Sequence, residues 1–409
     1  MLVEFKVKNY LSFKEEVLFS MEAGSTSKRP MNVFECGQES LLKNAALYGA
    51  NASGKSNLIK AFAFIRHLLL RDYNLEKNKI EAVPFKLSAE TEEKSSSFEI
   101  VFISKGVKYV YSFELNQDMI LKEELYEFPR KKLVFKRNRK SIEAGTKLKR
   151  IKKELPLPKE RELYLSTLAR AFDVIEDDII SWFRKLEIVT NGVNFTSTIK
   201  QLSENGISKE RVLDHLKRAD INIDDFLIQT DKVDMKSMPL EEQAIYGRLS
   251  MNSAGNLMRT RLETIKQKYD KDKNPAGKVI FNFFKEESAG TQHFFKFLGP
   301  IFDVIDNNKI LIVDELENSF HPLLLKFLVS IFNSEENKEA QLIFTAHDIS
   351  LLASDSPLRR DQIWFADKNK YGATSLYSLL EFKDTREDQD FQKKYLLGNF
   401  GAIPLIEDI

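Results

Sequence analysis

One eight-residue segment constrains the fold of this 409-residue chain more than any other. Residues 49–56 read Gly-Ala-Asn-Ala-Ser-Gly-Lys-Ser, which fits the pattern G-x-x-x-x-G-K-S/T. An apolar run at residues 45–48 precedes the segment, and a helical pattern of apolar residues follows it from 57 to 70. Glycines in such a loop let successive backbone N–H groups point at phosphate oxygens, and the following helix N-terminus adds positive potential. The segment therefore predicts a strand, a phosphate-binding loop and a helix, with a polyphosphate as the ligand.

The side chains of this loop indicate how the polyphosphate is held. We expect Lys55 to reach the terminal phosphates and Ser56 to coordinate magnesium. The residues of this segment expected to contact the nucleotide are Gly49, Asn51, Ala52, Ser53, Gly54, Lys55, Ser56 and Asn57. A chance glycine-rich turn is the alternative interpretation, and the strand before the loop and the helix after it argue against it.

A second segment ends a predicted buried strand with two acidic residues. Residues 310–313 are Ile-Leu-Ile-Val, and Asp314 and Glu315 follow directly. Parallel sheets bind ligands at the carboxyl ends of their strands. We therefore expect Asp314 to hold magnesium, through water, and Glu315 to accept a proton from the attacking water, with Glu317 as a weaker candidate for this base. Alone, the pattern also fits a strand end with exposed acids, and the phosphate loop favours the functional interpretation.

A third predicted strand, residues 341–344, is followed by His347. A single histidine is more often a structural residue than a ligand. This one is one of only five in the chain, and it follows a strand at the edge where parallel sheets place ligands. His347 is therefore a candidate for contact with a γ-phosphate.

The order of the remaining patterns predicts an α/β fold with an antiparallel part. Residues 1–21 resemble two strands, and several β-rich runs between 98 and 135 predict an antiparallel meander. Helical periodicity covers residues 163–227, and residues 231–276 are polar and poorly patterned. Strands and helices then alternate, as in a parallel, helix-covered sheet. We expect an N-terminal part at 1–160, a helical insertion at 161–275 and a C-terminal part at 276–409.

Composition excludes several classes of protein. The 62 Lys and Arg residues nearly balance 61 Asp and Glu, and a net charge of +1 excludes a uniformly basic nucleic-acid coat. Cys36 is the only cysteine, so a disulfide within the chain and a cysteine zinc site are excluded and a reducing compartment is favoured. The sequence has neither a signal-peptide pattern nor a membrane-span pattern. These features predict a cytoplasmic protein without membrane contact.

Residues 130–161 are the strongest local departure from this balance, with fourteen Lys and Arg against three Glu. A segment of this kind could contact the phosphate backbone of DNA or RNA, with salt-sensitive affinity that is independent of sequence. A solvated hairpin is the commoner explanation for such a segment.

Together the motifs resemble the ABC-type branch of P-loop ATPases, specifically the RecF, SMC and OLD-like group. Residues 287–292 look like the signature loop of that group, residues 318–322 are similar to its D-loop, and His347 matches its switch histidine. Residues 8–13 are similar to its N-F-x-S-F opening. The resemblance implies an α/β, ABC-ATPase-like P-loop NTPase head with a mixed sheet, an antiparallel β meander and a helical insertion.

A closer resemblance covers nearly the whole chain. It is to prokaryotic AAA-type ATP-binding proteins related to the RloA and AbiL abortive-infection components, whose C-terminal blocks look like residues 360–365 and 395–404. It implies ATP and Mg²⁺ as cofactors, and a nucleotide-sandwich dimer or higher oligomer. Ser288 and Gly290 of one subunit would then touch the γ-phosphate bound by the other. A Q-loop glutamine is not evident, because Gln117 also fits the tip of a hairpin.

Only 62 residues follow His347, which is too few for the nuclease domain of OLD-like enzymes, although residues 388–390 mimic its paired acids. We therefore expect an ATPase that dimerises around nucleotide and acts as a sensor or regulator of a separately encoded effector, a nuclease or toxin, in prokaryotic anti-phage defence. The alternatives are a RecF- or SMC-like DNA-repair ATPase and a non-hydrolysing nucleotide-dependent scaffold. The trigger, the effector and the choice of ATP over GTP are not specified by the residues alone.

Overall fold

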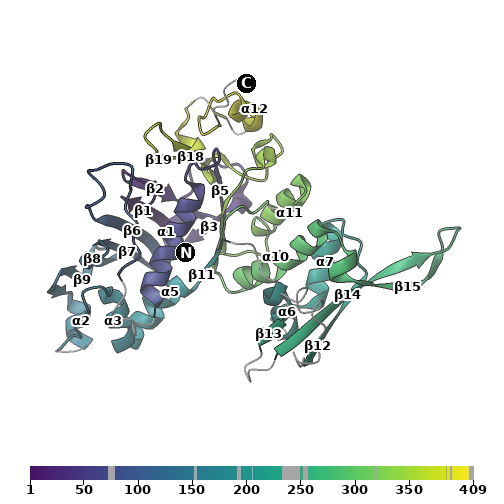
Figure 1. Ribbon diagram of the computed structural model, residues 1–409, viewed down its shortest axis with the longest axis horizontal. Coiled ribbons are helices and arrows are strands. Elements are labelled where there is room, and N and C mark those ends of the chain that lie inside the picture. Colours follow the sequence, from purple (N-terminus) through teal and green to yellow (C-terminus); the bar gives the residue numbers. More distant parts are fainter. Residues whose placement is uncertain are drawn as a thin grey trace. The chain divides into compact units, whose positions relative to one another are not determined.

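The computed structural model describes most of the chain in two compact units, which are drawn in Figure 1. The first unit comprises Met1–Asn191, Val304–Glu317 and Leu328–Ile409, and the second comprises Gly192–Asp303 and Asn318–Phe327. The described residues are 1–71, 79–151, 154–190, 195–204, 206–232, 249–251, 257–317, 320–383, 385–386 and 389–404.

The first unit contains a six-stranded sheet in the order β11-β16-β17-β5-β18-β19. All neighbours are parallel except β18 and β19, so the sheet is mixed, as expected. Its strands are β5 (Asn44–Tyr48), β11 (Leu186–Val189), β16 (Ile310–Val313), β17 (Gln341–Thr345), β18 (Ile363–Lys368) and β19 (Thr374–Ser378). Every residue of β5, β16 and β17 is buried, which explains their largely apolar composition.

A seven-stranded antiparallel sheet completes the β structure of this unit, apart from a two-stranded hairpin, β3 (Val33–Cys36) and β4 (Glu39–Leu42). Its order is β10-β9-β8-β7-β6-β1-β2. The strands are β1 (Leu2–Lys8), β2 (Val17–Ser20), β6 (Ser96–Ser104), β7 (Val107–Leu115), β8 (Ile120–Phe128), β9 (Lys132–Asn138) and β10 (Ser141–Ala144). The antiparallel meander expected from the β-rich runs between 98 and 135 is therefore confirmed.

Helix α1 (Lys55–Leu70) packs into the core between these sheets. Phe62 stacks on Phe5 of β1 with ring centroids 4.1 Å apart, and Leu47 of β5 belongs to the same core. The other helices in the range of this unit are α2 (Thr146–Ile151), α3 (Tyr164–Ala171), α4 (Asp173–Ile175), α5 (Ser181–Arg184) and α12 (Phe391–Leu396), and α11 (Pro322–Phe332) ends within it. One core therefore fixes the helix that begins at the phosphate loop.

The second unit combines helices with a four-stranded antiparallel sheet. The helices are α6 (Phe195–Ser203), α7 (Lys209–Arg218), α9 (Phe283–Glu286) and α10 (Ala289–Asp306), and the strands are β12 (Asp225–Lys232), β13 (Leu249–Met251), β14 (Leu257–Tyr269) and β15 (Pro275–Asn282). Its core is aromatic. Phe295 packs edge-to-face against Phe226 at 5.5 Å and tilted against Phe283 at 5.0 Å.

Two sequence-based expectations in this region were wrong in detail. Residues 163–227 are not all helical, because 186–189 form β11 of the parallel sheet and β12 begins at Asp225. Residues 231–276, expected to be poorly patterned, include strand β14 and the start of β15. β15 ends at Asn282, whose side chain accepts hydrogen bonds from Phe284 N and Lys285 N and so caps α9. The fold class is nevertheless the expected α/β one.

None of the helices that the structure describes is long and apolar enough to cross a membrane.

Candidate functional site

The three predicted strands that end in functional motifs are neighbours in the parallel sheet. Val313 of β16 pairs with Phe344 of β17, and Thr345 of β17 pairs with Leu47 of β5. Because all three run parallel, their carboxyl ends lie at one edge of the sheet. The topology therefore brings together the phosphate loop, the Asp314-Glu315 pair and His347, which are far apart in the sequence.

The phosphate loop has a backbone that only glycine fits at two positions. Gly49 and Gly54 have φ angles of 151° and 109°. A Cβ atom on Gly49 would lie 2.3 Å from the carbonyl oxygen of Ala366, and one on Gly54 would lie 2.3 Å from Oγ1 of Thr374. Gly54 is the N-cap of α1 and supplies no side chain there. The Asn57 N–H donates to the Gly54 carbonyl oxygen at 3.0 Å, and no side chain caps the N–H groups before it, where an anion can bind.

Lys55 is folded back into this loop. Its side chain is buried, and Nζ donates hydrogen bonds to the carbonyl oxygens of Gly49 at 2.7 Å and Ala50 at 3.1 Å. Burial lowers the pKa of Lys55, and the nearby carboxylates of Glu317, Asp314 and Glu315 oppose this shift. Lys55 is therefore a buried cation whose two hydrogen-bond partners are neutral carbonyl groups. A phosphate can replace these partners.

Asp314 accepts hydrogen bonds from the hydroxyl groups of two other segments. Ser56 Oγ donates to Asp314 Oδ1 at 3.1 Å, and Thr345 Oγ1 donates to the same oxygen at 2.7 Å. Thr345 Oγ1 also accepts the backbone N–H of Glu315 at 2.7 Å. Thr345 was not predicted as a site residue. Its position at the end of β17 would have been the signal.

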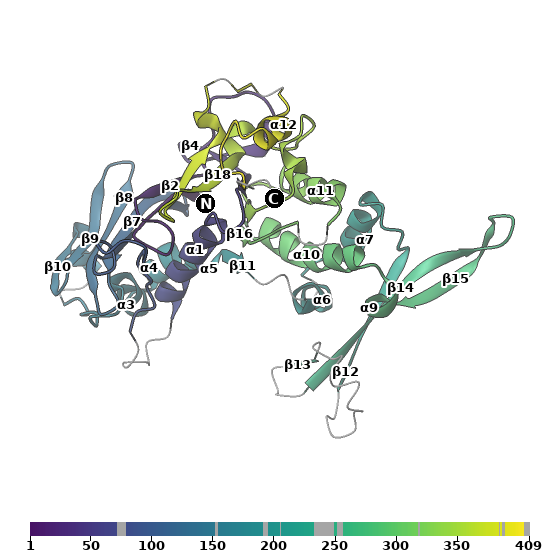
Figure 2. The same cartoon turned by 45° about the horizontal axis from the view of Figure 1, so that its top comes forward.

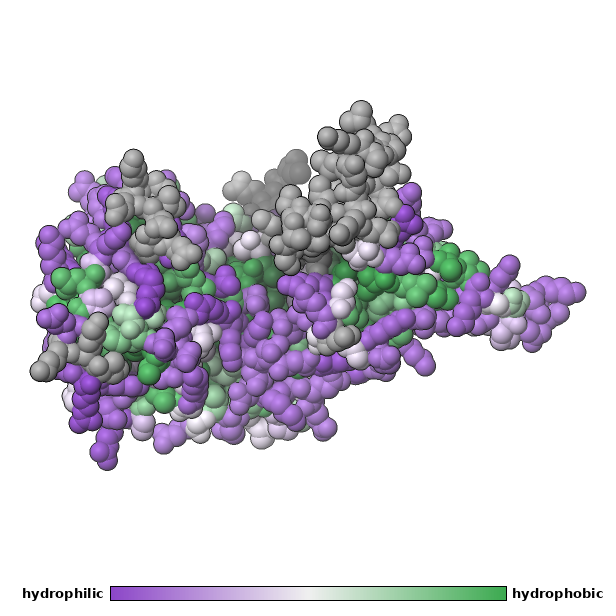
Figure 3. All heavy atoms as spheres, turned by 90° about the horizontal axis from the view of Figure 1, so that it is seen from below, coloured by the Kyte–Doolittle hydropathy of each residue, from purple (hydrophilic) through white to green (hydrophobic). Residues whose placement is uncertain are grey.

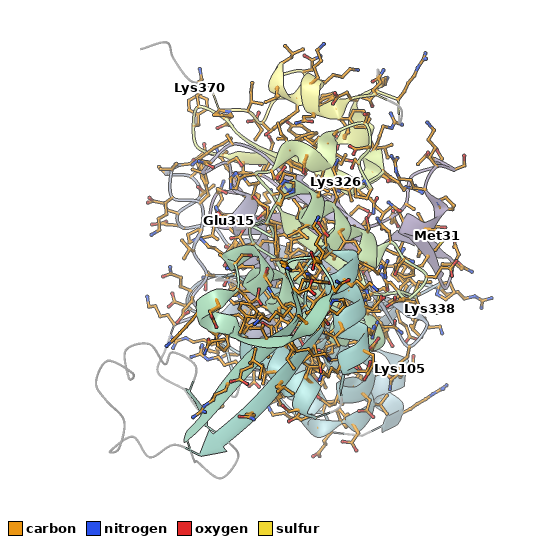
Figure 4. The ribbon with its side chains drawn as sticks, turned by 90° about the vertical axis from the view of Figure 1, so that its right-hand side faces the viewer. Met31, Lys105, Glu315, Lys326, Lys338 and Lys370 are labelled. Atoms are coloured by element: carbon orange, nitrogen blue, oxygen red, sulfur yellow. The ribbon has the colours of Figure 1, made fainter. Side chains whose placement is uncertain are left out.

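Glu315 and Glu317 contact His347 in different ways. Glu315, labelled in Figure 4, follows β16 closely, has a φ of 56° and keeps 56% of its side chain exposed. Its Oε1 lies 3.7 Å from His347 Nε2. Glu317 instead accepts the backbone N–H of His347, and its second carboxylate oxygen is buried without a partner among the described residues. Burial raises the pKa of Glu317.

Two further residues that the sequence reasoning did not assign hold the phosphate loop in place. Thr374 Oγ1 lies 2.7 Å from the carbonyl oxygen of Ser53 and 2.8 Å from Ser12 Oγ. Asn57 Nδ2 donates to Ser12 Oγ at 2.8 Å. Ser12 lies in the opening segment noted in the sequence, whereas nothing in the sequence indicated Thr374. The hydroxyl of Ser53 is buried without a partner among the described residues, so it remains available to a ligand.

A cavity of about 870 Å³ opens beside this site and extends along α1. Ser56, Asp314 and Thr190 line it, and Thr190 comes directly after β11. Gln117 does not line the cavity. It occupies the turn between β7 and β8, and its side chain donates to the carbonyl oxygen of Ala82 at 3.3 Å. The hairpin-tip interpretation of Gln117 is the one that the structure supports.

The expected signature residues belong to the second unit, whereas the phosphate loop belongs to the first. Ser288 Oγ accepts the backbone N–H of Thr291 at 3.1 Å and so caps α10, whose first turn contains Gly290. Glu287, directly before them, accepts Thr264 Oγ1 at 2.6 Å. Of the expected D-loop, residues 318 and 319 lie outside the described residues.

Glutamates of strand β8 pair with part of the basic stretch 130–161. Glu127 lies 3.6 Å from Lys132 and 3.7 Å from Lys147, and Glu124 lies 2.8 Å from Lys136. Lys152 and Lys153 lie outside the described residues. The stretch therefore presents less uncompensated positive charge than its composition predicts.

The site fits a polyphosphate with magnesium better than a metal held by protein alone. No group of three or more His, Cys, Asp or Glu side chains suited to a metal occurs in the part of the chain that the structure describes. Mg²⁺ typically binds one or two protein oxygens together with phosphate oxygens and water. Ser56 and Asp314 provide such a pair next to the phosphate loop.

Comparison with known proteins identifies one family. The model described as "AAA domain, putative AbiEii toxin, Type IV TA system" matches residues 45–185 and 149–353. These overlapping ranges span more than half of the chain. No curated protein matches this sequence.

Three solved SMC heads are similar to the chain at a distance. One, bound to the C-winged helix domain of ScpA, is 14% identical, with 92% of this chain and 97% of that one covered and a TM-score of 0.43. The SMC head domain from Thermotoga maritima is 12% identical, with coverages of 92% and 98% and a TM-score of 0.42. An Smc head with an extended coiled coil, bound to the C-terminal domain of ScpA from Pyrococcus furiosus, is 12% identical, with coverages of 97% and 98% and a TM-score of 0.44. The family assignment depends on the family model alone.

Proposed function

The chain belongs to this AAA-domain family of ATPases, and we propose that it binds ATP with Mg²⁺ at the edge of the parallel sheet and hydrolyses it. One observation supports the proposal above all others. The Asp314 carboxylate, at the end of β16, accepts the hydroxyl of Ser56, which directly follows the phosphate-loop lysine. The carboxylate and the hydroxyl that we propose as Mg²⁺ ligands are thus in direct contact.

The loop would hold the phosphates mainly through its backbone. Its N–H groups and those of the first turn of α1 would donate to phosphate oxygens, and the buried Ser53 hydroxyl is free to join them. Lys55 would exchange its two carbonyl contacts for the β- and γ-phosphates. Ser56 and Asp314 would hold Mg²⁺, which when bound neutralises the charge that develops on the phosphate oxygens.

Glu315 is the proposed general base. Its carboxylate is exposed to water, comes from the residue after Asp314, and lies close to His347. A carboxylate so placed can accept the proton of an attacking water. His347 would contact the γ-phosphate, and Glu317 would position His347 by accepting its backbone N–H.

A magnesium-dependent hydrolysis assay, combined with mass measurement with and without ATP, tests this proposal. Wild-type protein should release phosphate, and Glu315→Gln should stop turnover and accumulate an ATP-bound dimer. The same dimer would allow Ser288 and Gly290 of one subunit to approach nucleotide on the other. Absence of hydrolysis by the wild-type protein would favour the non-hydrolysing scaffold instead.

We further propose that this ATPase is a cytoplasmic sensor or regulator of a separately encoded nuclease or toxin in anti-phage defence. The toxin–antitoxin wording of the family description supports a role of this kind. Co-purification from the native locus tests it. Isolation of the protein alone, with no influence of neighbouring gene products on its ATPase activity, would contradict the role.

A further inference from the structure

Strands β14 and β15 form a ribbon that continues past the rest of their sheet (Figures 1 and 2). β12 pairs with β14 only up to Ile265, so beyond that residue β14 pairs with β15 alone. Every residue from 268 to 280 is exposed. In Figure 3 the outer end of this ribbon, at the right of the view, is mostly hydrophilic. Two-stranded ribbons are marginally stable in isolation, so this one depends on anchoring at its base.

The base of the ribbon is anchored by a single buried carboxylate. Glu287 Oε1 accepts Thr264 Oγ1 at 2.6 Å, and Glu287 Oε2 accepts Lys266 Nζ at 2.9 Å. Further out, Gln267 Nε2 donates to the carbonyl oxygen of Gly277 at 2.8 Å and links the two strands. The base of the ribbon is therefore fixed by contacts within the second unit.

The outer segment carries an excess of positive charge. Between residues 268 and 280 the acids are Asp270 and Asp272 alone, and the cations are Lys268, Lys271, Lys273 and Lys278. Asp270 is engaged in the turn, where it accepts the backbone N–H groups of Asp272 and Asn274. None of the four lysines forms an ion pair with a carboxylate among the described residues. This differs from the 130–161 stretch, where glutamates of β8 pair with several of the lysines.

The four lysines surround the ribbon instead of covering one side. Residues directly opposite in an antiparallel pair share a face, and neighbouring positions alternate. Lys278 is paired with Gln267, and Lys268 is paired with Gly277, so these two lysines project from opposite faces. Lys271 and Lys273 lie in the turn. A flat surface would meet only one of these faces, whereas a groove between two phosphate backbones would meet both.

We propose that the β14–β15 ribbon inserts into the major groove of B-form DNA and that these four lysines contact phosphates on both sides of it. The major groove is about 12 Å wide and admits a two-stranded β-ribbon. The corresponding groove of A-form RNA is too deep and narrow for this. The contacts go to phosphates, so binding is independent of base sequence and sensitive to salt.

The size of the salt effect follows from the number of lysines. Each neutralised phosphate of B-DNA contributes about −0.9 to the slope of log K against log salt, so four contacts predict a slope of about −3.6. DNA binding by the ribbon requires neither nucleotide nor hydrolysis. The proposal can therefore fail while the ATPase proposal stands, and the reverse is also true.

The test uses the full-length chain without nucleotide and a labelled 30-base-pair DNA duplex of random sequence. Fluorescence anisotropy at 50 to 200 mM salt measures affinity. The K268Q/K271Q/K273Q/K278Q variant should bind at least tenfold more weakly at 50 mM salt, with a flatter salt slope. Its thermal melting should match the wild type, because all four side chains are exposed. The matched control K140Q/K147Q/K149Q/R150Q removes four charges from the basic stretch and should change affinity less than twofold.

Several results would overturn the proposal. One is wild-type protein that fails to bind the duplex, or a ribbon variant that binds it as tightly as the wild type. The second is a larger loss of DNA affinity in the control variant than in the ribbon variant, which would indicate that residues 130–161 contact the DNA. The third is equal or tighter binding of duplex RNA or single-stranded DNA, which would contradict insertion into a B-form groove. If the ribbon variant instead lost a co-purifying protein while keeping its DNA affinity, the ribbon would be a protein-docking element and the proposal would be wrong.

Discussion

The Glu315 carboxylate lies 3.7 Å from His347 Nε2, and more than half of the Glu315 side chain is exposed. Both residues follow neighbouring parallel strands, β16 and β17. We expect Glu315→Gln to lower kcat for ATP hydrolysis by about 10²–10⁴-fold, because the amide cannot accept a proton from water. Nucleotide affinity should remain within about twofold of the wild type, since the phosphate loop is unchanged. Single-turnover hydrolysis and equilibrium binding of ATP separate the two effects.

Glu317→Gln is the matched control for this prediction. The amide oxygen can still accept the backbone N–H of His347, and the substitution removes a buried carboxylate whose second oxygen lacks a partner among the described residues. We expect most of the hydrolysis rate to remain. If Glu317→Gln stopped turnover and Glu315→Gln did not, the base would be Glu317.

Thr345 connects the proposed base to the proposed metal ligand. Its hydroxyl donates to Asp314 and accepts the N–H of Glu315. Partners that orient a metal ligand typically contribute 10- to 100-fold to metal affinity. We therefore expect Thr345→Val to raise the Mg²⁺ concentration needed for half-maximal hydrolysis by about tenfold or more, and Thr345→Ser to stay near the wild type. A valine variant with the Mg²⁺ requirement of the wild type would contradict the role of the hydroxyl, and a serine variant as defective as the valine variant would show that the methyl group is needed as well.

A buried ion pair predicts a large effect on stability away from this site. Arg359 and Asp361 are each 2% exposed and form two hydrogen bonds, of 2.9 and 2.5 Å. Removing one partner of a buried pair leaves an uncompensated charge, which typically costs about 3–5 kcal/mol. Asp361→Asn should lower the free energy of unfolding by about that amount in a urea titration.

The control for Asp361→Asn is an exposed pair. Lys105, labelled in Figure 4, lies 3.2 Å from Asp178 and is 60% exposed. Exposed pairs contribute about 0–1 kcal/mol. Lys105→Gln should therefore change stability by less than 1 kcal/mol, and equal losses in the two variants would contradict the role of burial.

The strands that carry the site were predictable because each is a continuous apolar run. Residues 45–48 and 310–313 can only be buried, and parallel topology then dictates that the residues after them meet at one edge. The contact of Thr374 with the phosphate loop could not be predicted in this way. Thr374 reaches Ser53 and Ser12 through tertiary packing of β19 against the loop, and one threonine in an edge strand has no pattern of its own.

The long strand β14 could not be predicted from the sequence, for a different reason. Its inward positions include a buried threonine, Thr264, beside Leu262, and arginine, lysine and glutamine occupy much of the remainder. The hydroxyl of Thr264 is satisfied by Glu287, which lies 23 positions further along the chain. Periodicity of apolar residues cannot detect a strand stabilised by such a distant polar contact.

Glu123 predicts how stability depends on pH. Its carboxylate is fully buried and accepts hydrogen bonds from Tyr164 N at 2.6 Å, Leu165 N at 2.8 Å and the Tyr111 hydroxyl at 2.9 Å. Burial raises its pKa above the usual value of 4.5, although these backbone donors and Arg137 oppose the shift.

The folded protein therefore binds this proton more tightly than the unfolded chain does. The resulting stabilisation is fully present below pH 4.5 and is lost as pH rises through the raised pKa of the folded state. Glutamine cannot titrate, so the stability of the wild type relative to Glu123→Gln should increase as pH falls from 7 towards 4.5. Urea unfolding of both proteins across this range measures the difference. A difference that stayed constant, or that decreased on acidification, would mean that the pKa of Glu123 is not raised in the folded protein.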